Sequence, residues 1–385
     1  MAFAVDNNND GFDAPDDFQM STKIMVFGVG GAGGNAVEHM VNTGVSDVDY
    51  VIANTDVAAL RNKDGKMMNR VQIGRKTTGG RGAGNDPSKG RASAEENKDD
   101  IAEKLDGVSM LFVTAGMGGG TGTGAAPVVA SVAKERGILT VGVVTKPFKF
   151  EGVSKMNQAL AGIAEMKKYV DALIVIPNER LKQLKGTKLS LKDAFAAVDN
   201  ILCKAVMGVI QLLQGEGYIN VDFADITMAL KDSGIAHIAI GKGRGDTRHD
   251  DAIDEVLHSP LLETSIDGAR RGLLNVSVPD SFLLDDFDSL MEDITNKFNS
   301  EAKYKLGVVY DSTLDDEEIS IIAVATDFAE EDSDVFEDED DIVPMPSVTV
   351  APASDGLSGS VGFKNSSGDV DVDALLDKFH RIRDN

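Results

Sequence analysis

The sequence predicts an α/β protein: a Rossmann-like first domain of three layers around a parallel sheet, a long central helix, and a second α+β domain with a mixed sheet. Short apolar runs alternate with helical patterns from residue 23 to residue 177, and an apolar helical pattern of about 24 residues follows. After that pattern, strict alternation stops. Strands that alternate with helices pair in parallel, and helices then cover both faces of the sheet.

The strands of the first domain, residues 21–190, are predicted at short, continuous apolar runs. In order they are Lys23–Gly28, Tyr50–Asn54, Val71–Ile73, Met110–Ala115, Leu139–Val144 and Ala172–Pro177. The helices between them are predicted where apolar residues recur with helical spacing, at Gly34–Thr43, Ala92–Leu105, Ala126–Arg136 and Val153–Lys168. Apolar runs without polar alternation are typical of strands that are buried on both faces.

The central helix is predicted at Leu191–Gln214, within a linking segment of residues 191–216, because its apolar positions recur on more than one side. Glycines at 215 and 217 end it. The second domain is expected over residues 217–328. Its elements are the strands His237–Gly241, Asn275–Val278, Leu306–Tyr310 and Ile319–Ala325 and the helices Ile253–Leu257 and Asp285–Phe298.

The two ends of the chain have a different composition. Residues 1–20 are polar and acidic, and we expect a disordered extension there. Residues 329–368 are acidic and then rich in Ser, Gly and Pro, as in a flexible linker. In residues 369–385, the apolar side chains of Leu375, Leu376, Phe379 and Ile382 share one helical face, which favours a docking peptide over a frayed tail.

Composition excludes several classes of protein. The net charge is −25 with no basic stripe, so we expect no nucleic-acid partner. The chain has no apolar run of 18 residues, so direct membrane insertion is not expected. A single cysteine, Cys203, rules out a disulfide framework, favours the cytoplasm, and leaves no Cys/His cluster with metal-ligand spacing.

A glycine-rich run follows the predicted strand Met110–Ala115 and precedes a helical pattern. It comprises Gly116, Met117, Gly118, Gly119, Gly120, Thr121, Gly122, Thr123 and Gly124. Glycines allow the backbone to approach a phosphate closely, and N–H groups at a helix N-terminus then converge on its oxygens. The run therefore predicts a phosphate-binding loop to which the threonines add hydroxyl donors.

A second glycine loop, Gly28 to Asn35, follows the first strand and fits G-x-G-x-x-G. Taken alone, this motif favours a dinucleotide site and hence an NAD-dependent oxidoreductase. Two glycine loops at the carboxyl ends of two strands of one sheet provide more N–H donors than a single diphosphate needs. The pair therefore favours one polyphosphate held from two sides. The sequence has neither a Walker-type motif nor an obvious hydride-transfer constellation.

The residues Gly118 to Gly124 resemble the signature loop of the tubulin/FtsZ family of GTPases. The resemblance extends in order over residues 22–326, through the first glycine loop, Arg81 to Pro87, Thr145 to Phe148, Phe150 to Gly152, Ile176 to Arg180 and Asn220 to Asp225. Several unrelated motifs in the correct order make the match specific. The resemblance implies a GTPase that binds GTP and GDP, assembles head to tail with copies of itself, and forms a filament at the site of cell division.

The resemblance assigns roles to individual residues. Those that would contact phosphates or base are Gly31, Ala32, Gly33, Gly34 and Asn35 in the first loop and Gly118, Gly119, Gly120, Thr121, Gly122, Thr123 and Gly124 in the second. Those expected around the ribose and guanine are Glu151, Lys155, Asn178, Phe195 and Asp199. A carboxylate at position 199 suits guanine, because guanine presents two adjacent N–H donors and adenine does not. Lys155 stands where the family usually has arginine, so we expect weaker nucleotide retention or altered turnover.

The resemblance also implies that Asn220, Asp222 and Asp225 are catalytic. A 24-residue helix spans about 36 Å, so these residues would lie too far from the phosphates of their own chain and would act on a neighbour's nucleotide. Mg²⁺ would be held by phosphates and water. Alternatively, the acids cap the following helix, with Asp225 directly before Ile226. A structural polymer with weak hydrolysis stays a second possibility. Membrane-tethering and regulatory division proteins are expected to bind the C-terminal peptide, which matches the family's usual tail poorly.

Overall fold

Six parallel strands form the first part of the sheet, as the sequence predicts. The computed structural model describes residues 22–43, 47–63, 68–183, 190–214, 217–259, 269–297 and 303–328. The strands are β1 (Ile24–Val29), β2 (Val48–Asn54), β3 (Met68–Gln72), β4 (Met110–Gly116), β5 (Leu139–Lys146) and β6 (Ala172–Pro177). Their order is β3-β2-β1-β4-β5-β6, and each neighbouring pair is parallel. Their carboxyl ends therefore meet at one edge of the sheet.

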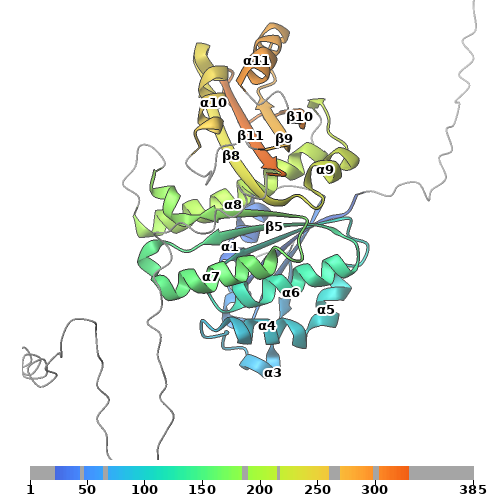
Figure 1. Cartoon of the computed structure of the whole chain (residues 1–385), viewed down its shortest axis with the longest axis vertical. Helices are drawn as coiled ribbons and strands as arrows, with labels where there is room; N and C mark the ends of the chain where they lie inside the picture. Colours follow the sequence, from blue (N-terminus) through green and yellow to red (C-terminus); the bar gives the residue numbers. More distant parts are fainter. Residues whose placement is uncertain are drawn as a thin grey trace, which may run out of the picture. The chain divides into compact units, whose positions relative to one another are not determined.

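Helices cover both faces of these strands (Figure 1). They are α1 (Gly30–Asn42), α2 (Val57–Arg61), α3 (Arg75–Thr78), α4 (Pro87–Glu96), α5 (Lys98–Lys104), α6 (Thr121–Glu135) and α7 (Val153–Met166). Alternate residues of β1 serve different cores: Val26 packs with α1 and the long helix α8 (Leu191–Gln214), whereas Phe27 packs with α4 to α7. This arrangement confirms the predicted three layers.

Several element boundaries differ from those predicted, most of all at the helices near the glycine loops. The single helix expected over Ala92–Leu105 is two helices, α4 and α5, and Asn97, with φ −116° and ψ 27°, interrupts them. Helix α4 begins earlier, at Pro87, where Asp86 accepts a hydrogen bond from the backbone N–H of Ser88. Helices α1 and α6 also begin earlier than predicted, so glycines expected in loops form their first turns. Low helix propensity of glycine hid these turns from the sequence pattern.

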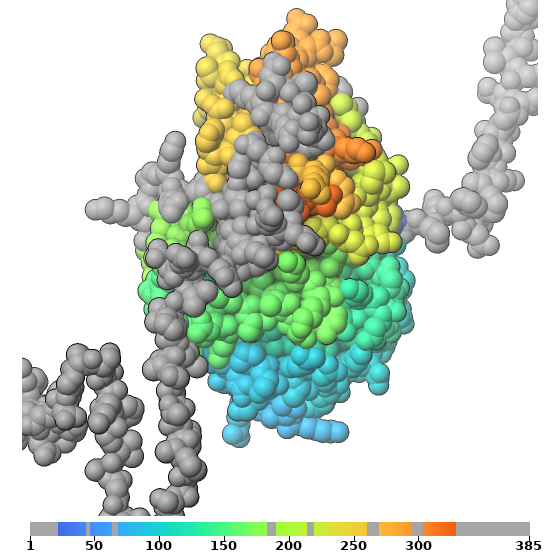
Figure 2. Space-filling view, in the orientation of Figure 1, coloured from blue at the N-terminus to red at the C-terminus, as the bar shows by residue number. Residues whose placement is uncertain are grey.

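The later strands form the mixed sheet that the sequence predicts. The elements are β7 (Gly217–Ile219), α9 (Phe223–Leu230), β8 (Gly234–Arg244), α10 (Arg248–Leu257), β9 (Arg271–Val278), α11 (Leu284–Lys297), β10 (Lys303–Tyr310) and β11 (Glu318–Thr326). Strand β9 is parallel to β10, whereas β11 is antiparallel to both β8 and β9, and β10 is antiparallel to β7. The first residues of β8, Gly234 to Ala236, pair with β6 and join the two groups of strands. In Figure 2 most of the later residues, coloured yellow to orange, lie in the upper part of the view, above those coloured blue to green.

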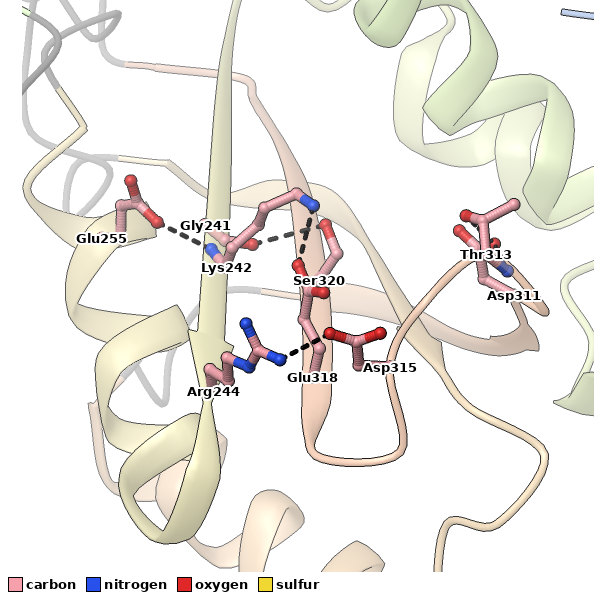
Figure 3. A network of polar contacts seen from close by, with 9 residues as sticks. All are labelled: Gly241, Lys242, Arg244, Glu255, Asp311, Thr313, Asp315, Glu318 and Ser320. Atoms are coloured by element: carbon pink, nitrogen blue, oxygen red, sulfur yellow. Dashed lines mark hydrogen bonds and ion pairs between the residues drawn. The ribbon is translucent and has the colours of Figure 1, made fainter. Parts of the chain in front are cut away.

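Ion pairs join β8 to the β10–β11 connection and β11 on the solvent side (Figure 3). Lys242 Nζ lies 2.9 Å from Glu318 Oε1, and Arg244 Nη2 lies 2.6 Å from Asp315 Oδ2. The backbone N–H of Lys242 also donates to Glu255 Oε2 at 2.7 Å, which ties α10 to the same strand. Exposed pairs of this kind contribute at most about 1 kcal/mol each. The antiparallel ladder and the apolar core therefore hold this part together.

Helix α8 connects the two groups of strands. By length and hydropathy the segment Leu191–Leu213 could cross a membrane, but most of it is buried within the protein. Leu202, Val206, Val209 and Ile210 pack into the core shared with α1 and β5. The apolar composition of α8 is that of a helix packed on several sides.

Candidate functional site

A cavity of about 460 Å³ opens at the carboxyl ends of β4 and β5, between the starts of α1, α6 and α8. This volume lies within the range of small-molecule sites. Its lining residues are Gly31, Ala32, Asn35, Gly116, Met117, Gly119, Gly120, Thr121, Gly122, Thr145, Pro147, Glu151, Lys155, Asn178, Phe195, Val198 and Asp199. Both glycine loops and the start of the long helix thus contribute to one site, as the sequence predicts.

The two glycine loops touch each other. A Cβ atom placed on Gly30 would lie 2.9 Å from the backbone nitrogen of Gly122, and Gly30 has a φ of +78°. A Cβ on Gly33 would lie 2.3 Å from the carbonyl oxygen of Thr114, so α1 lies directly against β4. A Cβ on Gly31 would meet nothing within 4 Å, because Gly31 faces the cavity. Gly30 and Gly33 therefore allow close packing of backbone on backbone, whereas Gly31 leaves the backbone of the same motif accessible from the cavity.

The second loop is held by its own side chains and by α4. The N–H of Gly118, whose φ is +97°, donates to Thr123 Oγ1 at 2.8 Å. A Cβ on Gly124 would lie 2.0 Å from the carbonyl oxygen of Pro87, so α4 fixes the outer side of the loop. Gly119 faces open space, with the nearest atom 4.0 Å from a built Cβ. The loop backbone is thus rigid where it packs and accessible where it faces the cavity.

Two helix N-termini point at the phosphate end of the cavity. Helices α1 and α6 both begin there, neither has a side-chain cap hydrogen bond, and neither has an acidic residue in its first turn. Uncapped N-terminal N–H groups carry partial positive charge and bind anions. The Thr121 hydroxyl lies 2.6 Å from that of Thr55, which holds Thr121 at the start of α6. This end of the cavity is therefore suited to a polyphosphate despite the acidic chain.

Aromatic and polar side chains form the other end. The Phe195 ring, 42% exposed, meets the buried Phe148 ring edge-on with centroids 5.5 Å apart. Asn178 is 5% exposed, and its Oδ1 atom has no hydrogen-bond partner within the part of the chain that the structure describes. A buried, unpaired acceptor that lines a cavity indicates a missing donor. The pair fits a planar base or a ribose that carries N–H or O–H groups.

Asp199 and Glu151 are the carboxylates that line the cavity. Burial raises the pKa of Asp199 to about 6, although the Asn35 amide and the Lys63 charge oppose this rise. Glu151 accepts a hydrogen bond from the backbone N–H of Phe148 at 3.0 Å and pairs with Lys155 Nζ at 2.9 Å. These contacts hold the Glu151 carboxylate in place at the lining of the cavity.

The structure brings most of the predicted contact residues together, but not all of them. Gly33, Gly34, Gly118, Thr123 and Gly124 do not line the cavity. Thr123 is 4% exposed and bonds its own loop, so its hydroxyl supports the loop. Thr145, Pro147 and Val198 also line the cavity, although the sequence did not assign them to the site, and Gly116 and Met117 line it although they were predicted only as part of the glycine-rich run. Their place in the sheet could have identified two of them, because Thr145 and Pro147 lie at the carboxyl end of β5, the strand next to β4.

The three predicted catalytic residues lie at the other end of α8. Asn220 and Asp222 are exposed between β7 and α9, and Asp225 is partly exposed in the first turn of α9. Asp222 caps α9, because its Oδ1 accepts from the backbone N–H of Asp225 at 2.7 Å. The expectation that Asp225 caps this helix is therefore wrong, since α9 begins at Phe223. Asp225 Oδ1 instead pairs with Lys305 Nζ at 2.6 Å.

Two family models match the chain. Residues 23–186 match the GTPase domain of the tubulin/FtsZ family, and residues 234–329 match the C-terminal domain of the FtsZ family. The chain is 45% identical over 325 residues to the cell division protein FtsZ of Aquifex aeolicus, and the match covers 84% of this chain and 88% of that protein. It is 44% identical over 304 residues to the FtsZ of Wigglesworthia glossinidia brevipalpis, with 79% of this chain and 78% of that protein covered.

Solved structures agree with the sequence matches. The structure of the empty FtsZ dimer from M. jannaschii superposes with a TM-score of 0.75 at 37% identity, covering 79% of this chain and 88% of that one. A GDP-bound monomer of CetZ1 from Haloferax volcanii superposes with a TM-score of 0.67 at 22% identity, covering 82% and 98%. At that lower identity the second likeness concerns the fold alone.

Proposed function

The chain belongs to the tubulin/FtsZ family of GTPases, and from this premise we propose that it assembles head to tail at a bacterial division site and hydrolyses GTP between subunits. Family membership sets aside the NAD-dependent oxidoreductase that the first glycine loop suggests on its own. The chain binds GTP and GDP and self-associates as a member of this family. The proposal concerns where the catalytic residues act, which partners bind, and where the filament forms.

One observation carries the proposal. The cavity is lined by Phe195 and Asp199 near the first residue of α8, whereas Asp222 lies beyond its last residue. At 1.5 Å per residue, α8 extends about 22 Å from Asp199 to its last residue, Gln214. The acid therefore cannot reach a γ-phosphate in the cavity of its own chain. Head-to-tail stacking would bring it to the cavity of the next subunit, and such a heterologous contact repeats into an open filament.

The cavity residues suit GTP in one orientation. Gly31 and Gly119 leave space for phosphate oxygens at the uncapped ends of α1 and α6. Within the described part of the chain the buried Oδ1 of Asn178 has no partner and is available to a ribose or base donor, and the exposed part of the Phe195 ring is available for stacking. Asp199, when ionised, accepts both the N1–H and the amino group of guanine. Discrimination against adenine follows because adenine has no N1–H.

The neighbour's acids would act on water. Asp222 and Asp225 would orient the attacking water and accept its proton, while Asn220 would position the loop. Phosphoryl transfer depends mainly on positioning and charge stabilisation, so a site completed by assembly makes turnover depend on assembly. Mg²⁺ would be held by the phosphates and water rather than by a dedicated set of side chains. When bound, Mg²⁺ would neutralise charge on the β- and γ-phosphates.

A mixing experiment tests action between subunits. Asp222→Asn keeps the capping geometry of α9 and removes the charge, and we expect it to lower GTP turnover by about a hundredfold while GTP still binds. Gly31→Ala places a methyl group in the cavity, and we expect it to weaken nucleotide binding by more than about tenfold. In an equimolar mixture, the Gly31→Ala subunit supplies intact acids to the occupied cavity of the Asp222→Asn subunit. Phosphate release should then exceed the sum of the two separate samples.

Two results would contradict the proposal. Full turnover by Asp222→Asn alone would show that Asp222 has no catalytic role. A mixture that never exceeds the sum, with co-sedimentation showing that both variants enter one polymer, would place the acids and the nucleotide in the same subunit. Sedimentation with GTP and with GDP, followed together with phosphate release, also separates this proposal from a structural filament with weak hydrolysis.

Localisation and further partners follow from the family. We infer that the filament forms in the cytoplasm at the septal ring, consistent with the name cell division protein that its relatives carry. The C-terminal peptide, residues 369–385, would bind membrane-tethering and regulatory division proteins. It lies outside the described residues, as do the N-terminal extension 1–20 and the linker 329–368. Fluorescent fusions with and without residues 369–385 would test the peptide, since only the full chain should form a ring at midcell.

A further inference from the structure

Lys63 is a cationic side chain that the roles described above leave without a function. It follows α2 and lines a smaller cavity of about 200 Å³, which shares Gly31 and Asn35 with the larger one. Its side chain is only 15% exposed. A lysine withdrawn from water in this way needs partners that compensate for the lost hydration.

Among the described residues, the Lys63 ammonium group has two hydrogen-bond acceptors, and both belong to α1. Its Nζ donates to Glu38 Oε2 at 2.6 Å and to Asn35 Oδ1 at 2.5 Å. Glu38 neutralises the charge, so that the lysine can stay partly buried. Asn35 lies one turn earlier on the same helix and lines the nucleotide cavity. The lysine thus joins the segment after α2 to a residue of the site.

Lys63 also decides which way the Asn35 amide points. An ammonium group can only donate hydrogen bonds, so the Asn35 atom that receives its bond must be the oxygen. The amide NH₂ of Asn35 is then left to donate, and the carboxylate within its reach is Asp199. A carboxylate accepts hydrogen bonds and donates none, so the orientation is consistent along the whole chain of contacts.

We propose that Lys63 is a positioning residue for guanine recognition: it orients the Asn35 amide toward Asp199 and keeps that carboxylate ionised and directed at the base. The proposal rests on the proposed role of Asp199 as the reader of guanine. The charged and titratable groups that act on Asp199 are Lys63 and His39, which favour its ionised form, and Glu38, which opposes it. Without the Lys63 charge, less would oppose the effect of burial, and the carboxyl group would hold its proton to higher pH.

The test compares GDP affinity at pH 6 and pH 8 by calorimetry, in full-length protein with Mg²⁺. The variants are Lys63→Met, which keeps the length of the side chain, and Lys63→Arg, which keeps its charge. Lys98→Met is the matched control. Lys98 Nζ forms an exposed ion pair with Glu135 at 2.9 Å, and neither residue lines either cavity. Ratios to the wild type at the same pH cancel the titration of the nucleotide phosphates.

For Lys63→Met we expect about fivefold weaker GDP binding at pH 6 and less than a twofold loss at pH 8, because loss of one adjacent opposite charge moves a carboxyl pKa by about one unit or more. Lys63→Arg should restore most of the affinity at pH 6, and Lys98→Met should equal the wild type at both values. Circular dichroism at pH 8 should show that Lys63→Met is folded.

Three outcomes would overturn the inference. Equal affinity of Lys63→Met and the wild type at pH 6 would show no coupling to the base. An equal loss at pH 6 and pH 8 would show that Lys63 does not act through the ionisation of Asp199. Failure of Lys63→Arg to restore binding, with the protein folded, would show that charge is not the cause. Asp199→Asn tests the underlying function separately: if it still prefers GDP to ADP, the role of Asp199 fails whatever Lys63 does.

Discussion

Gly31 and Gly33 belong to one motif and one turn of α1, yet we predict opposite effects from the same substitution. A Cβ on Gly33 would lie 2.3 Å from the carbonyl oxygen of Thr114, whereas a Cβ on Gly31 would meet nothing within 4 Å. Thr114 cannot yield easily, because its strand β4 is hydrogen-bonded to β1 on one side and to β5 on the other. Gly33→Ala must therefore move α1 away from the sheet.

The magnitude follows from two opposing terms. Overpacking against a rigid backbone atom costs about 3 kcal/mol, at the upper end of the usual range. Alanine in place of glycine within a helix returns up to about 1 kcal/mol. Gly33→Ala should therefore destabilise the protein by about 2 kcal/mol and lower Tm by roughly 4–8 °C. Gly31→Ala should leave Tm unchanged or raise it slightly, and should weaken GDP binding by more than about tenfold, because its methyl group projects into the cavity.

Differential scanning fluorimetry without nucleotide and GDP titration calorimetry measure the two effects separately. Gly79→Ala is a further control for Gly31→Ala. A Cβ on Gly79 also meets nothing within 4 Å, but Gly79 has a φ of +62°, so alanine there adds backbone strain without a steric clash. The reasoning is refuted if Gly31→Ala and Gly33→Ala lower Tm equally, or if Gly31→Ala binds GDP as the wild type does.

Three further predictions concern stability and the base. Burial raises the Asp199 pKa to about 6 from 3.8, so the contribution of this group to folding is fully present below about pH 4 and is lost as pH rises through 6. Asp199→Asn should therefore stabilise the nucleotide-free protein at pH 8 by about 1 kcal/mol, a figure discounted for partial exposure, as urea unfolding would show. Burial lowers the His237 pKa to about 4 from 6.5, so stability should fall by up to about 3 kcal/mol between pH 6.5 and pH 4, and much less in a folded His237→Gln variant. Phe195→Ala should weaken GDP binding about tenfold with little change in Tm, because the Phe195 ring is partly exposed. Phe148→Ala should cost about 3–5 kcal/mol of stability, because the Phe148 ring is buried, and equal Tm values for the two variants would contradict this prediction.

Periodicity in the sequence predicted most elements because each strand and helix carries its own burial pattern. The runs at Met110–Ala115 and Leu139–Val144 became β4 and β5 with little change, since strands covered on both faces must be apolar throughout. The starts of α1 and α6 were missed because glycine has no helical pattern of its own. Tertiary packing overrides propensity there, as the contact between Gly33 and Thr114 shows.

The candidate site could likewise be predicted only in part from the sequence. Two glycine loops at strand ends were visible as local motifs, and their convergence followed from parallel strand order. The roles of individual glycines were not visible, because Gly31 and Gly33 are chemically identical and differ only in what lies opposite them. Thr123 likewise could not be distinguished from Thr121 until the structure showed that it bonds the N–H of Gly118.

The sequence by itself determined the fold class, the nucleotide loops, and the distance along α8 that separates Asp199 from Asp222, because each depends on residues near one another in the chain. Only the tertiary structure decided that Lys63 reaches Asn35, that the buried Asn178 acceptor has no partner among the residues described, and that Asp222 caps α9. These facts depend on side chains brought together from separate elements, and their energies arise from burial and geometry that no local pattern encodes.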